Sequence, residues 1–361
     1  MKTDPRILLH NKVIGFNIRE LPAPNVIPPR ILVIPRGFPP VLTALLRDSA
    51  DACVAARYPD DVEDLCARGF RELLLLFPIQ EHHRLQVLQT AARHSLKRLI
   101  VPVDHYAHLE VLSEVAMQCD CQIECLINSD LTGRAGGVRP GHDSSRLLHA
   151  LTSLPGVHPG GFLINLRSLE SDSAQCQPTA VTLVQLQEVM KNARSAVRYT
   201  LEMARNVASL PPELPSYWRL PVSATTSADG LGNLFGNPLR TDGDFLISET
   251  FLFRLRTTRD GDLGDGRLRR TFPAISFQSH VVSRPSLDRA VVDNPLRLST
   301  EQSRLATVSL PDGASIELVD DEVIVLHLTG AARDLIIGAV VEFSVASWLP
   351  VFDALPWSVT D

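Results

Sequence analysis

The sequence predicts an α/β fold in which a (β/α)8 barrel of the TIM type, residues 1–240, is followed by a C-terminal all-β domain, residues 241–361. From residue 31 onward, short apolar runs alternate with stretches of helical periodicity. Repeated strand–helix units indicate a parallel sheet with right-handed crossovers. About seven or eight units in some 200 residues fit a closed barrel better than an open sheet. After residue 240, short strand-like runs alternate with turn signals such as DGD and PDG, which indicates a β domain.

The barrel elements follow from the apolar pattern. The run ELLLLF at 72–77 is continuously apolar, as expected of a parallel strand covered on both faces. Residues 1–30 contain a proline-rich connector and could pack on the β domain. The predicted strands are 31–34, 52–56, 72–77, 99–103, 123–127, 161–166 and 220–223, and the predicted helices are 41–47, 60–68, 84–94, 107–117, 144–153 and 181–207.

The β domain contains a predicted hairpin or meander. Its first strand, 275–282, should end at Ser283-Arg284-Pro285, because proline cannot donate to a strand ladder. Its second strand is 290–292. This arrangement would bring Arg284, Arg289 and Asp293 to one end of a sheet. Further strands are predicted at 245–247, 251–256, 316–319, 323–328 and 340–345.

Composition narrows the classes of function. The chain has 361 residues, is 45% hydrophobic and carries a net charge of −6 without a long basic run. This balance argues against binding to nucleic acid or to an anionic membrane. No apolar run reaches the roughly 20 residues of a membrane span, and the N-terminus shows no apolar segment of signal-peptide length. We therefore expect a cytoplasmic protein.

Three of the six cysteines cluster at Cys119, Cys121 and Cys125. They could form a soft-metal or redox site. The segment CQIECLI also fits a buried strand that uses cysteine as a small apolar residue. Structural zinc sites use paired CxxC-type spacings, and a second pair is absent, so the strand interpretation is favoured and no metal is expected.

Several segments together resemble the D-threonine aldolase and D-serine dehydratase family. These segments are VPVDHYAHLEVL, LINSDLTGRAGGVRPG, DGDFLISETF, VVSRP followed by RAVVD, and VEFSVASWLPVFD. They occur along the chain in the order of the family. The resemblance implies an alanine-racemase-like barrel with a C-terminal β domain and a pyridoxal-phosphate cofactor. It also implies a homodimer in which the β domain of one subunit packs at the barrel of the other.

The residues that carry the family chemistry are changed. In that family a lysine after the first barrel strand holds the cofactor as an imine, and here Arg36, a candidate substrate-binding residue, stands in that segment. A guanidinium cannot form an imine because it stays protonated. The chain has only four lysines, Lys2, Lys12, Lys97 and Lys191. We therefore expect no cofactor, or pyridoxal phosphate bound without a covalent bond.

Two further family sites are altered. The glycine-rich phosphate loop is replaced by SATTS, residues 223–227, in which Thr225 and Thr226 could still bind an anion. The zinc pair of the family falls on Ser347 and Leu349, neither of which is a suitable zinc ligand.

Candidate catalytic groups each have a structural alternative. Glu249 could be a general acid or base with a pKa raised by burial, or a strand-end carboxylate paired with an arginine. His280 could move protons near pH 7, or be a half-buried polar residue. Asp104 and His105, with Tyr106 as a substrate contact, follow a predicted barrel strand at the end where barrel enzymes place their active sites.

Arg134 and Arg284 could clamp a substrate carboxylate, or form structural salt bridges. The sequence thus favours an enzyme that acts without pyridoxal phosphate on an amino-acid-derived amine or carbonyl substrate. Carbon–carbon cleavage and imine condensation of the Pictet–Spengler type are the reactions expected. A pyridoxal-phosphate aldolase or dehydratase with non-covalent cofactor and an inactive partner subunit remain alternatives.

Overall fold

The chain forms two compact units. One comprises residues 22–34 and 39–249, and the other comprises residues 1–21, 35–38 and 250–361. None of the described helices is long and apolar enough to cross a membrane. The computed structural model describes residues 6–10, 30–34, 43, 46, 53–57, 61–76, 78, 96–131, 136–166, 183–205, 210–211, 213–220, 243–248, 275–294, 310–320, 322–344 and 357–360.

The first unit is a closed barrel of eight parallel strands, which confirms the predicted fold class. Closure is made by the first and last strands, where Arg30 pairs with Leu246 and Leu32 pairs with Ser248. The strands are β2 (Arg30–Ile34), β3 (Cys53–Ala56), β4 (Glu72–Leu75), β5 (Arg98–Val103), β6 (Ile123–Ser129), β7 (Val157–Asn165), β8 (Ser216–Arg219) and β9 (Asp244–Ser248).

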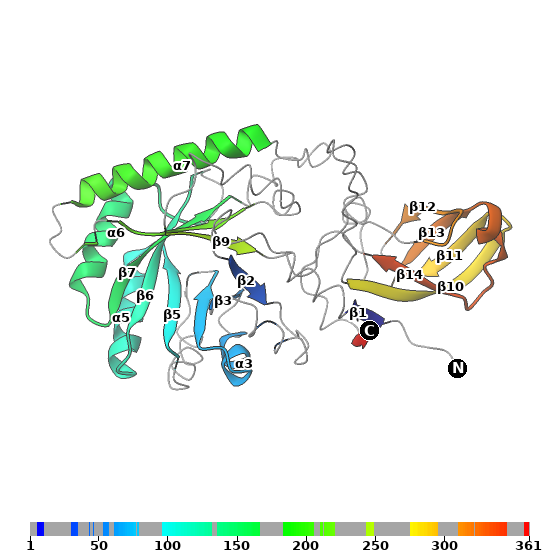
Figure 1. Ribbon diagram of the computed structural model, residues 1–361, viewed down its shortest axis with the longest axis horizontal. Helices are drawn as coiled ribbons and strands as arrows, with labels where there is room; N and C mark the ends of the chain where they lie inside the picture. Colours follow the sequence, from blue (N-terminus) through cyan, green and yellow to red (C-terminus); the bar gives the residue numbers. More distant parts are fainter. Residues whose placement is uncertain are drawn as a thin grey trace, which may run out of the picture. The chain divides into compact units, whose positions relative to one another are not determined.

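Helices lie outside the strands (Figure 1). The described helices are α3 (Asp61–Ala67), α5 (Tyr106–Gln118), α6 (His142–Ser153) and α7 (Leu183–Ala204). On α7, Arg194 forms an ion pair of 2.9 Å with buried Asp244 of β9, and its guanidinium lies 4.9 Å from the ring centre of Trp218 of β8. These contacts fix the last two strands to the longest described helix.

Alternate residues of the strands fill the barrel interior. Side chains from all eight strands form one buried cluster: Ile31, Val33, Cys53, Ala55, Leu74, Leu76, Ile100, Leu126, Leu163, Tyr217 and Ile247. Because strand side chains alternate between faces, Arg98, Glu124 and Asn128 also point to the interior face. Polar interior residues therefore lie near both ends of the apolar cluster.

Two strand assignments made from the sequence were wrong. The seventh barrel strand is β8 at 216–219 rather than 220–223, because Tyr217 fills the interior while Trp218 packs against α7. Residues 245–247 belong to the barrel rather than to the β domain, since β9 pairs with both β8 and β2. The division between the units accordingly falls at Glu249 and Thr250, later than the expected boundary at 240.

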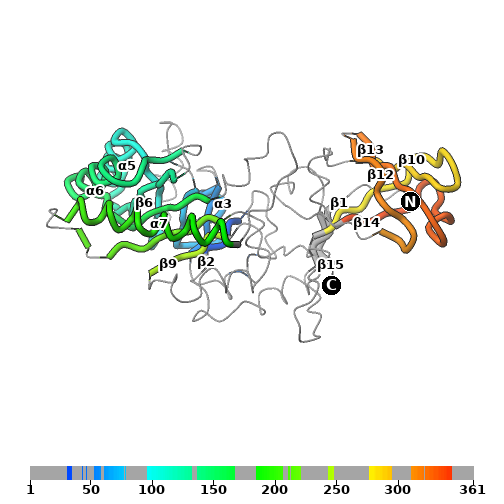
Figure 2. Tube along the Cα trace, turned by 90° about the horizontal axis from the view of Figure 1, so that it is seen from above, coloured from blue at the N-terminus to red at the C-terminus, as the bar shows by residue number. Residues whose placement is uncertain are grey.

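The second unit contains a seven-stranded sheet in the order β12-β13-β11-β10-β1-β15, with β14 also paired to β10. Figure 2 shows β10, β12, β13 and β14 of this sheet together. The N-terminal strand β1 belongs to this sheet through antiparallel pairing with β10. The bounds are β1 (Arg6–His10), β10 (Ile275–Ser286), β11 (Arg289–Asp293), β12 (Ala314–Val319), β13 (Val323–Leu328), the 3-10 turn Gly330–Asp334, β14 (Val340–Ser344) and β15 (Trp357–Thr360).

The predicted hairpin exists, but it is longer than expected. Strand β10 continues through Pro285 to Ser286, which pairs with Arg289. Register shifts after Val281 and Ser283 create irregular positions, and these tolerate a proline that a regular ladder would exclude. Asp293 lies at the other end of β11 from Arg289, so the expectation that Arg284, Arg289 and Asp293 share one end was wrong.

Candidate functional site

A polar cluster lies at the carboxyl end of β5, where the chain turns into α5. Asp104 follows the last residue of β5, and His105 is the N-cap of α5. The Nδ1 atom of His105 accepts a hydrogen bond of 3.2 Å from the main-chain N–H of Ala107. This contact replaces a partner that the first turn of a helix lacks. Barrel enzymes carry their chemistry at this end of the strands.

Asp104 forms a dyad with His108, a histidine that our sequence interpretation did not single out. Nδ1 of His108 lies 3.0 Å from Oδ1 of Asp104, and both side chains are mostly buried, with 14% and 16% of their surface exposed. Asp104 precedes the N-cap of α5, and His108 lies in the first turn of the helix, which brings its ring back to the strand end. The spacing D-x-x-x-H was the signal in the sequence that could have revealed this pair.

The second oxygen of Asp104 contacts the neighbouring strand. Nδ2 of Asn128, near the end of β6, donates to Oδ2 of Asp104 at 3.3 Å and to the carbonyl of Gly136 at 3.1 Å. Asn128 is buried. The carboxylate is therefore held from α5 on one oxygen and from β6 on the other.

These contacts change the acidity of Asp104. Burial raises the pKa of this carboxyl group, but the contacts with His108 and Asn128 together lower it by more. The pKa of Asp104 consequently lies below its ordinary value of 3.8. Hydrogen bonds and positive charge favour the ionised form, so the side chain is a carboxylate at neutral pH.

This shift predicts a contribution of Asp104 to acid unfolding. A carboxyl group whose pKa is lower in the folded chain stabilises the fold fully above its unfolded pKa, and this stabilisation is lost as the pH falls through the folded value. In urea unfolding at about pH 6 and about pH 3, Asp104→Asn should lose less stability with acid than the wild type. The exposed-carboxylate control Asp143→Asn should keep the wild-type dependence; equal acid dependence in Asp104→Asn and the wild type would contradict the prediction.

Of the site residues predicted from sequence, the structure places Asp104, His105 and Tyr106 together at the start of α5. Tyr106 is 46% exposed, and the rings of His105 and His108 lie edge to face with centres 6.1 Å apart. Glu249, Arg36, Arg134, Thr225 and Thr226 lie outside the described residues, so their roles remain predictions.

His280 and Arg284 both lie on β10 in the second unit. The main-chain N–H of His280 donates to Oδ1 of Asp293 at 3.0 Å. The guanidinium of Arg284 donates to main-chain carbonyls, among them those of Leu287 at 3.0 Å and Arg333 at 3.1 Å, and that of Leu335. These contacts hold the β10–β11 turn against the 3-10 turn, which favours the structural interpretation of Arg284; its substrate-binding role remains a prediction.

We next asked whether the described residues suit covalently bound pyridoxal phosphate. Lys97 is exposed and precedes β5 at the amino end of the strands, where its N–H donates to the carbonyl of Arg71 at 2.8 Å. Lys191 is exposed on the outer helix α7. Among the described residues, no lysine lies at the carboxyl end of the barrel strands, whereas Lys2 and Lys12 lie outside that part of the chain.

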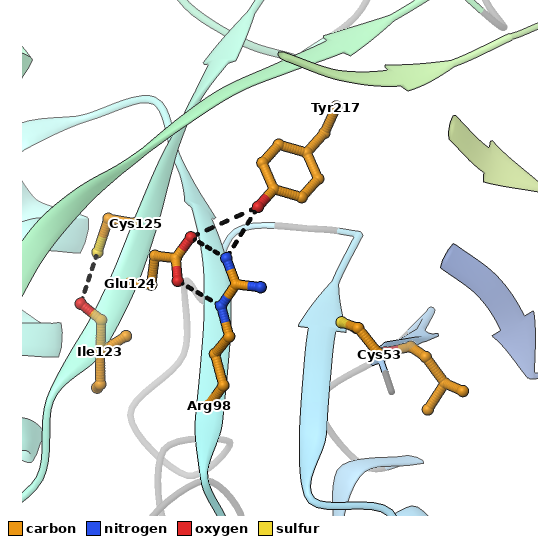
Figure 3. Close-up of polar contacts among 7 residues, drawn as sticks. Cys53, Arg98, Ile123, Glu124, Cys125 and Tyr217 are labelled. Atoms are coloured by element: carbon orange, nitrogen blue, oxygen red, sulfur yellow. Dashed lines mark hydrogen bonds and ion pairs between the residues drawn. The ribbon is translucent and has the colours of Figure 1, made fainter. Parts of the chain in front are cut away.

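A second polar cluster occupies the barrel interior at the amino end of the strands. Arg98 of β5 makes two contacts of 2.6 Å with the carboxylate of Glu124 on β6 and donates to the hydroxyl of Tyr217 on β8 at 3.1 Å. Figure 3 shows the three groups in mutual contact, since the hydroxyl of Tyr217 also donates to the carboxylate of Glu124 at 3.5 Å. The hydrogen bond with Glu124 raises the pKa of Arg98, and burial raises that of Tyr217.

We assign this second cluster a structural role. The amino end of barrel strands carries stability rather than catalysis. A Cβ atom on Gly160 of β7 would lie 2.1 Å from Cγ of Glu124, so the absence of a side chain there gives the carboxylate its space. Three strands are joined across the barrel by groups that are far apart in the sequence.

The cysteine segment forms part of β6. Cys125 is fully buried and its thiol pKa is raised by burial, which suits an apolar core residue and opposes thiolate chemistry. Cys119 and Cys121 are partly exposed at the end of α5. Within the described ranges, no three histidine, cysteine or acidic side chains gather as a metal site.

The eight-stranded parallel barrel and the β domain together give the chain an alanine-racemase-like fold. Solved structures of this class superpose on nearly the whole chain. D-threonine aldolase from Filomicrobium marinum has a TM-score of 0.74 at 15% identity, covering 98% of this chain and 89% of its own. D-threo-3-hydroxyaspartate dehydratase from Delftia sp. HT23 has a TM-score of 0.69 at 16% identity, covering 99% and 95%.

An alanine racemase from Clostridium difficile 630, in complex with cycloserine, has a TM-score of 0.63 at 11% identity and covers 98% of this chain and 93% of its own. No protein-family model and no curated protein sequence matches the chain. The likeness is thus one of fold, and it agrees with the fold that the sequence resemblance implied.

Proposed function

We propose that the chain is an enzyme that acts by acid–base catalysis on an amino-acid-derived amine or carbonyl substrate, without pyridoxal phosphate bound to a lysine. The observation that carries the proposal is the Asp104–His108 dyad at the carboxyl end of β5. Histidine is the commonest proton-transfer residue because its side chain changes charge near neutral pH.

The atoms of the dyad suit this role. Both oxygens of Asp104 are engaged, one by His108 and the other by Asn128, so Asp104 orients and stabilises rather than accepts a substrate proton. The opposite ring nitrogen of His108, Nε2, is the atom left for exchange with substrate. A histidine oriented by a carboxylate is the general-base arrangement of many hydrolases and lyases.

The reaction class follows from the scaffold and the dyad. Retro-aldol cleavage requires removal of the hydroxyl proton, and the electron pair of the broken carbon–carbon bond passes to a carbonyl group of the substrate, which is protonated afterwards. Condensation of an amine with an aldehyde requires proton transfers from nitrogen and to the oxygen that leaves as water. A single positioned histidine can take part in either. We therefore propose retro-aldol cleavage of an amino-acid-derived β-hydroxy carbonyl compound, whose own carbonyl group accepts the electron pair, or an imine condensation such as a Pictet–Spengler cyclisation.

A substrate panel tests this proposal. Purified protein is incubated with β-hydroxy ketones and β-hydroxy aldehydes derived from amino acids, with release of aldehyde measured, and with arylethylamines plus aldehydes, with the cyclised product measured. We expect turnover in one arm and its loss in His108→Gln. Absence of turnover throughout the panel would instead favour an inactive partner subunit.

The absence of an imine-bound cofactor is a separate prediction, motivated by the positions of Lys97 and Lys191. Borohydride reduction of the purified protein incubated with pyridoxal phosphate, followed by peptide mass spectrometry, should find no pyridoxyl group on a specific lysine. A stoichiometric pyridoxyl group on any of the four lysines would contradict the prediction.

One alternative has support from the comparisons. D-threonine aldolase and D-threo-3-hydroxyaspartate dehydratase share the fold, and the chain could be an aldolase or dehydratase that binds pyridoxal phosphate non-covalently. An absorbance band of the bound cofactor that dialysis removes together with the activity would favour this alternative. The homodimer and the cytoplasmic location expected from the sequence remain predictions.

A further inference from the structure

We infer that Asn128 is a positioning residue that fixes the tautomer of His108 through the carboxylate of Asp104. The catalytic meaning of this inference rests on the proposed function, but the tautomer itself does not. The network connects three elements, since Asn128 lies on β6, Asp104 follows β5 and His108 lies on α5.

The two oxygens of the Asp104 carboxylate contact different partners. Oδ2 of Asp104 accepts from Nδ2 of Asn128 at 3.3 Å, and Oδ1 lies 3.0 Å from Nδ1 of His108. A carboxylate that rotated about its side-chain bonds would exchange or lose these partners. The donor on β6 therefore holds Oδ1 towards the imidazole.

The donor, Asn128, is itself held in place. Asn128 is 6% exposed, and its amide also donates to the carbonyl of Gly136 at 3.1 Å. The carbonyl of Asn128 accepts from the N–H of Val138 at 2.8 Å, and Val138 bridges to Ser129. Both the side chain and the main chain of Asn128 are thus bound to the returning segment 136–138.

A glycine makes this close return possible. Gly137 has a φ of +143°, and a Cβ atom there would lie 2.9 Å from both the carbonyl oxygen of Asn128 and the N–H nitrogen of Asp130. A side chain at this position would push the returning segment away from β6. The segment that anchors Asn128 is therefore itself fixed by the backbone.

The imidazole of His108 faces Asp104 through its Nδ1 atom. Nδ1 of His108 is buried and lies 3.0 Å from Oδ1 of Asp104, but within the described part of the chain it does not meet the geometry of a hydrogen bond. Its contact with Oδ1 is close but not ideally aligned, so the position of the carboxylate decides how well the proton is held. A carboxylate accepts but cannot donate, so neutral His108 keeps its proton on Nδ1 and leaves Nε2 as the acceptor.

The test uses nitrogen NMR of the full chain with ¹⁵N-labelled histidine, recorded on the neutral imidazole. The signals of His108 are assigned by their absence in His108→Gln. In the wild type we expect the Nδ1–H tautomer. Asn128→Leu keeps the approximate size and removes the donor, and the ratio of Nδ1–H to Nε2–H should fall by about tenfold, the scale of one hydrogen bond to a charged group.

Two further variants keep the test decisive if Asn128→Leu folds poorly. Asn128→Ser retains a donor and should give a tautomer ratio between those of wild type and Asn128→Leu. Asn294→Ala is the matched control, because Asn294 is likewise buried and donates to the carbonyl of Asp320, but lies on the other unit. It should leave the His108 signals unchanged.

An unchanged tautomer ratio in both folded Asn128 variants would overturn the inference, and so would a wild type that already carries its proton on Nε2. The proposed function fails by a different observation, namely unchanged turnover in His108→Gln. In that case a tautomer shift in Asn128→Leu would still establish the positioning role, and the two failures are distinguishable.

Discussion

Replacement of His108 by glutamine is expected to lower kcat by about a hundredfold or more, the usual contribution of a general acid or base. Glutamine keeps a polar side chain of similar length at the first turn of α5 but cannot move a proton. The measurement is steady-state turnover of the substrate identified in the panel, together with urea unfolding to confirm that the fold is intact.

Two further variants serve as comparisons for the turnover of His108→Gln. Asp104→Asn should also lower kcat, since it removes the group that orients the imidazole and stabilises its charged form. His149→Gln, an exposed histidine on the outer helix α6, should keep wild-type kcat. If His108→Gln retains wild-type turnover, proton transfer belongs to another group, and Glu249 or His280 becomes the residue to replace next.

The second large effect is expected from the cluster at the amino end of the strands. Arg98→Met should lower the free energy of unfolding by about 2–3 kcal/mol, because it leaves the carboxylate of Glu124 without its cation. The cost lies below the roughly 3–5 kcal/mol of fully buried pairs, since water reaches the side chain of Arg98, which is 33% exposed against 12% for Glu124.

Variants of Glu124, the partner of Arg98, and of a surface ion pair provide the comparison for Arg98→Met. Glu124→Gln should cost less, about 1–2 kcal/mol, because Arg98 can turn towards water and an amide still accepts one hydrogen bond. Arg289→Met, which breaks an exposed pair with Glu317 on the β domain, should cost under about 1 kcal/mol. Chemical denaturation followed by circular dichroism checks these values; equal costs for Arg98→Met and Arg289→Met would contradict a structural role for the buried pair.

The fold could be predicted from the sequence because its signals are local. The continuous apolar run at 72–77 and the repeated strand–helix spacing identify a parallel barrel without knowledge of any contact. The errors arose where the local pattern is ambiguous. Residues 245–247 are apolar and short, and only pairing with β2 and β8 shows that they close the barrel.

The candidate site could be predicted only in part. Asp104 was found because it follows a strand at the catalytic end of a barrel, and His108 was missed although it lies four residues later. Asn128 contacts Asp104 across 24 positions of sequence, and Arg98 meets Tyr217 across 119, so no local pattern could reveal either contact. The glycine requirement at Gly160 likewise depends on the carboxylate of Glu124 on the adjacent strand.

The central claim is that proton transfer at the carboxyl end of β5 proceeds without pyridoxal phosphate. The most direct test measures turnover before and after treatment with hydroxylamine and exhaustive dialysis, which strips pyridoxal phosphate from proteins that hold it. The account predicts the same kcat before and after treatment, and no increase when pyridoxal phosphate is added back. Loss of turnover on stripping, restored by added pyridoxal phosphate, would contradict it.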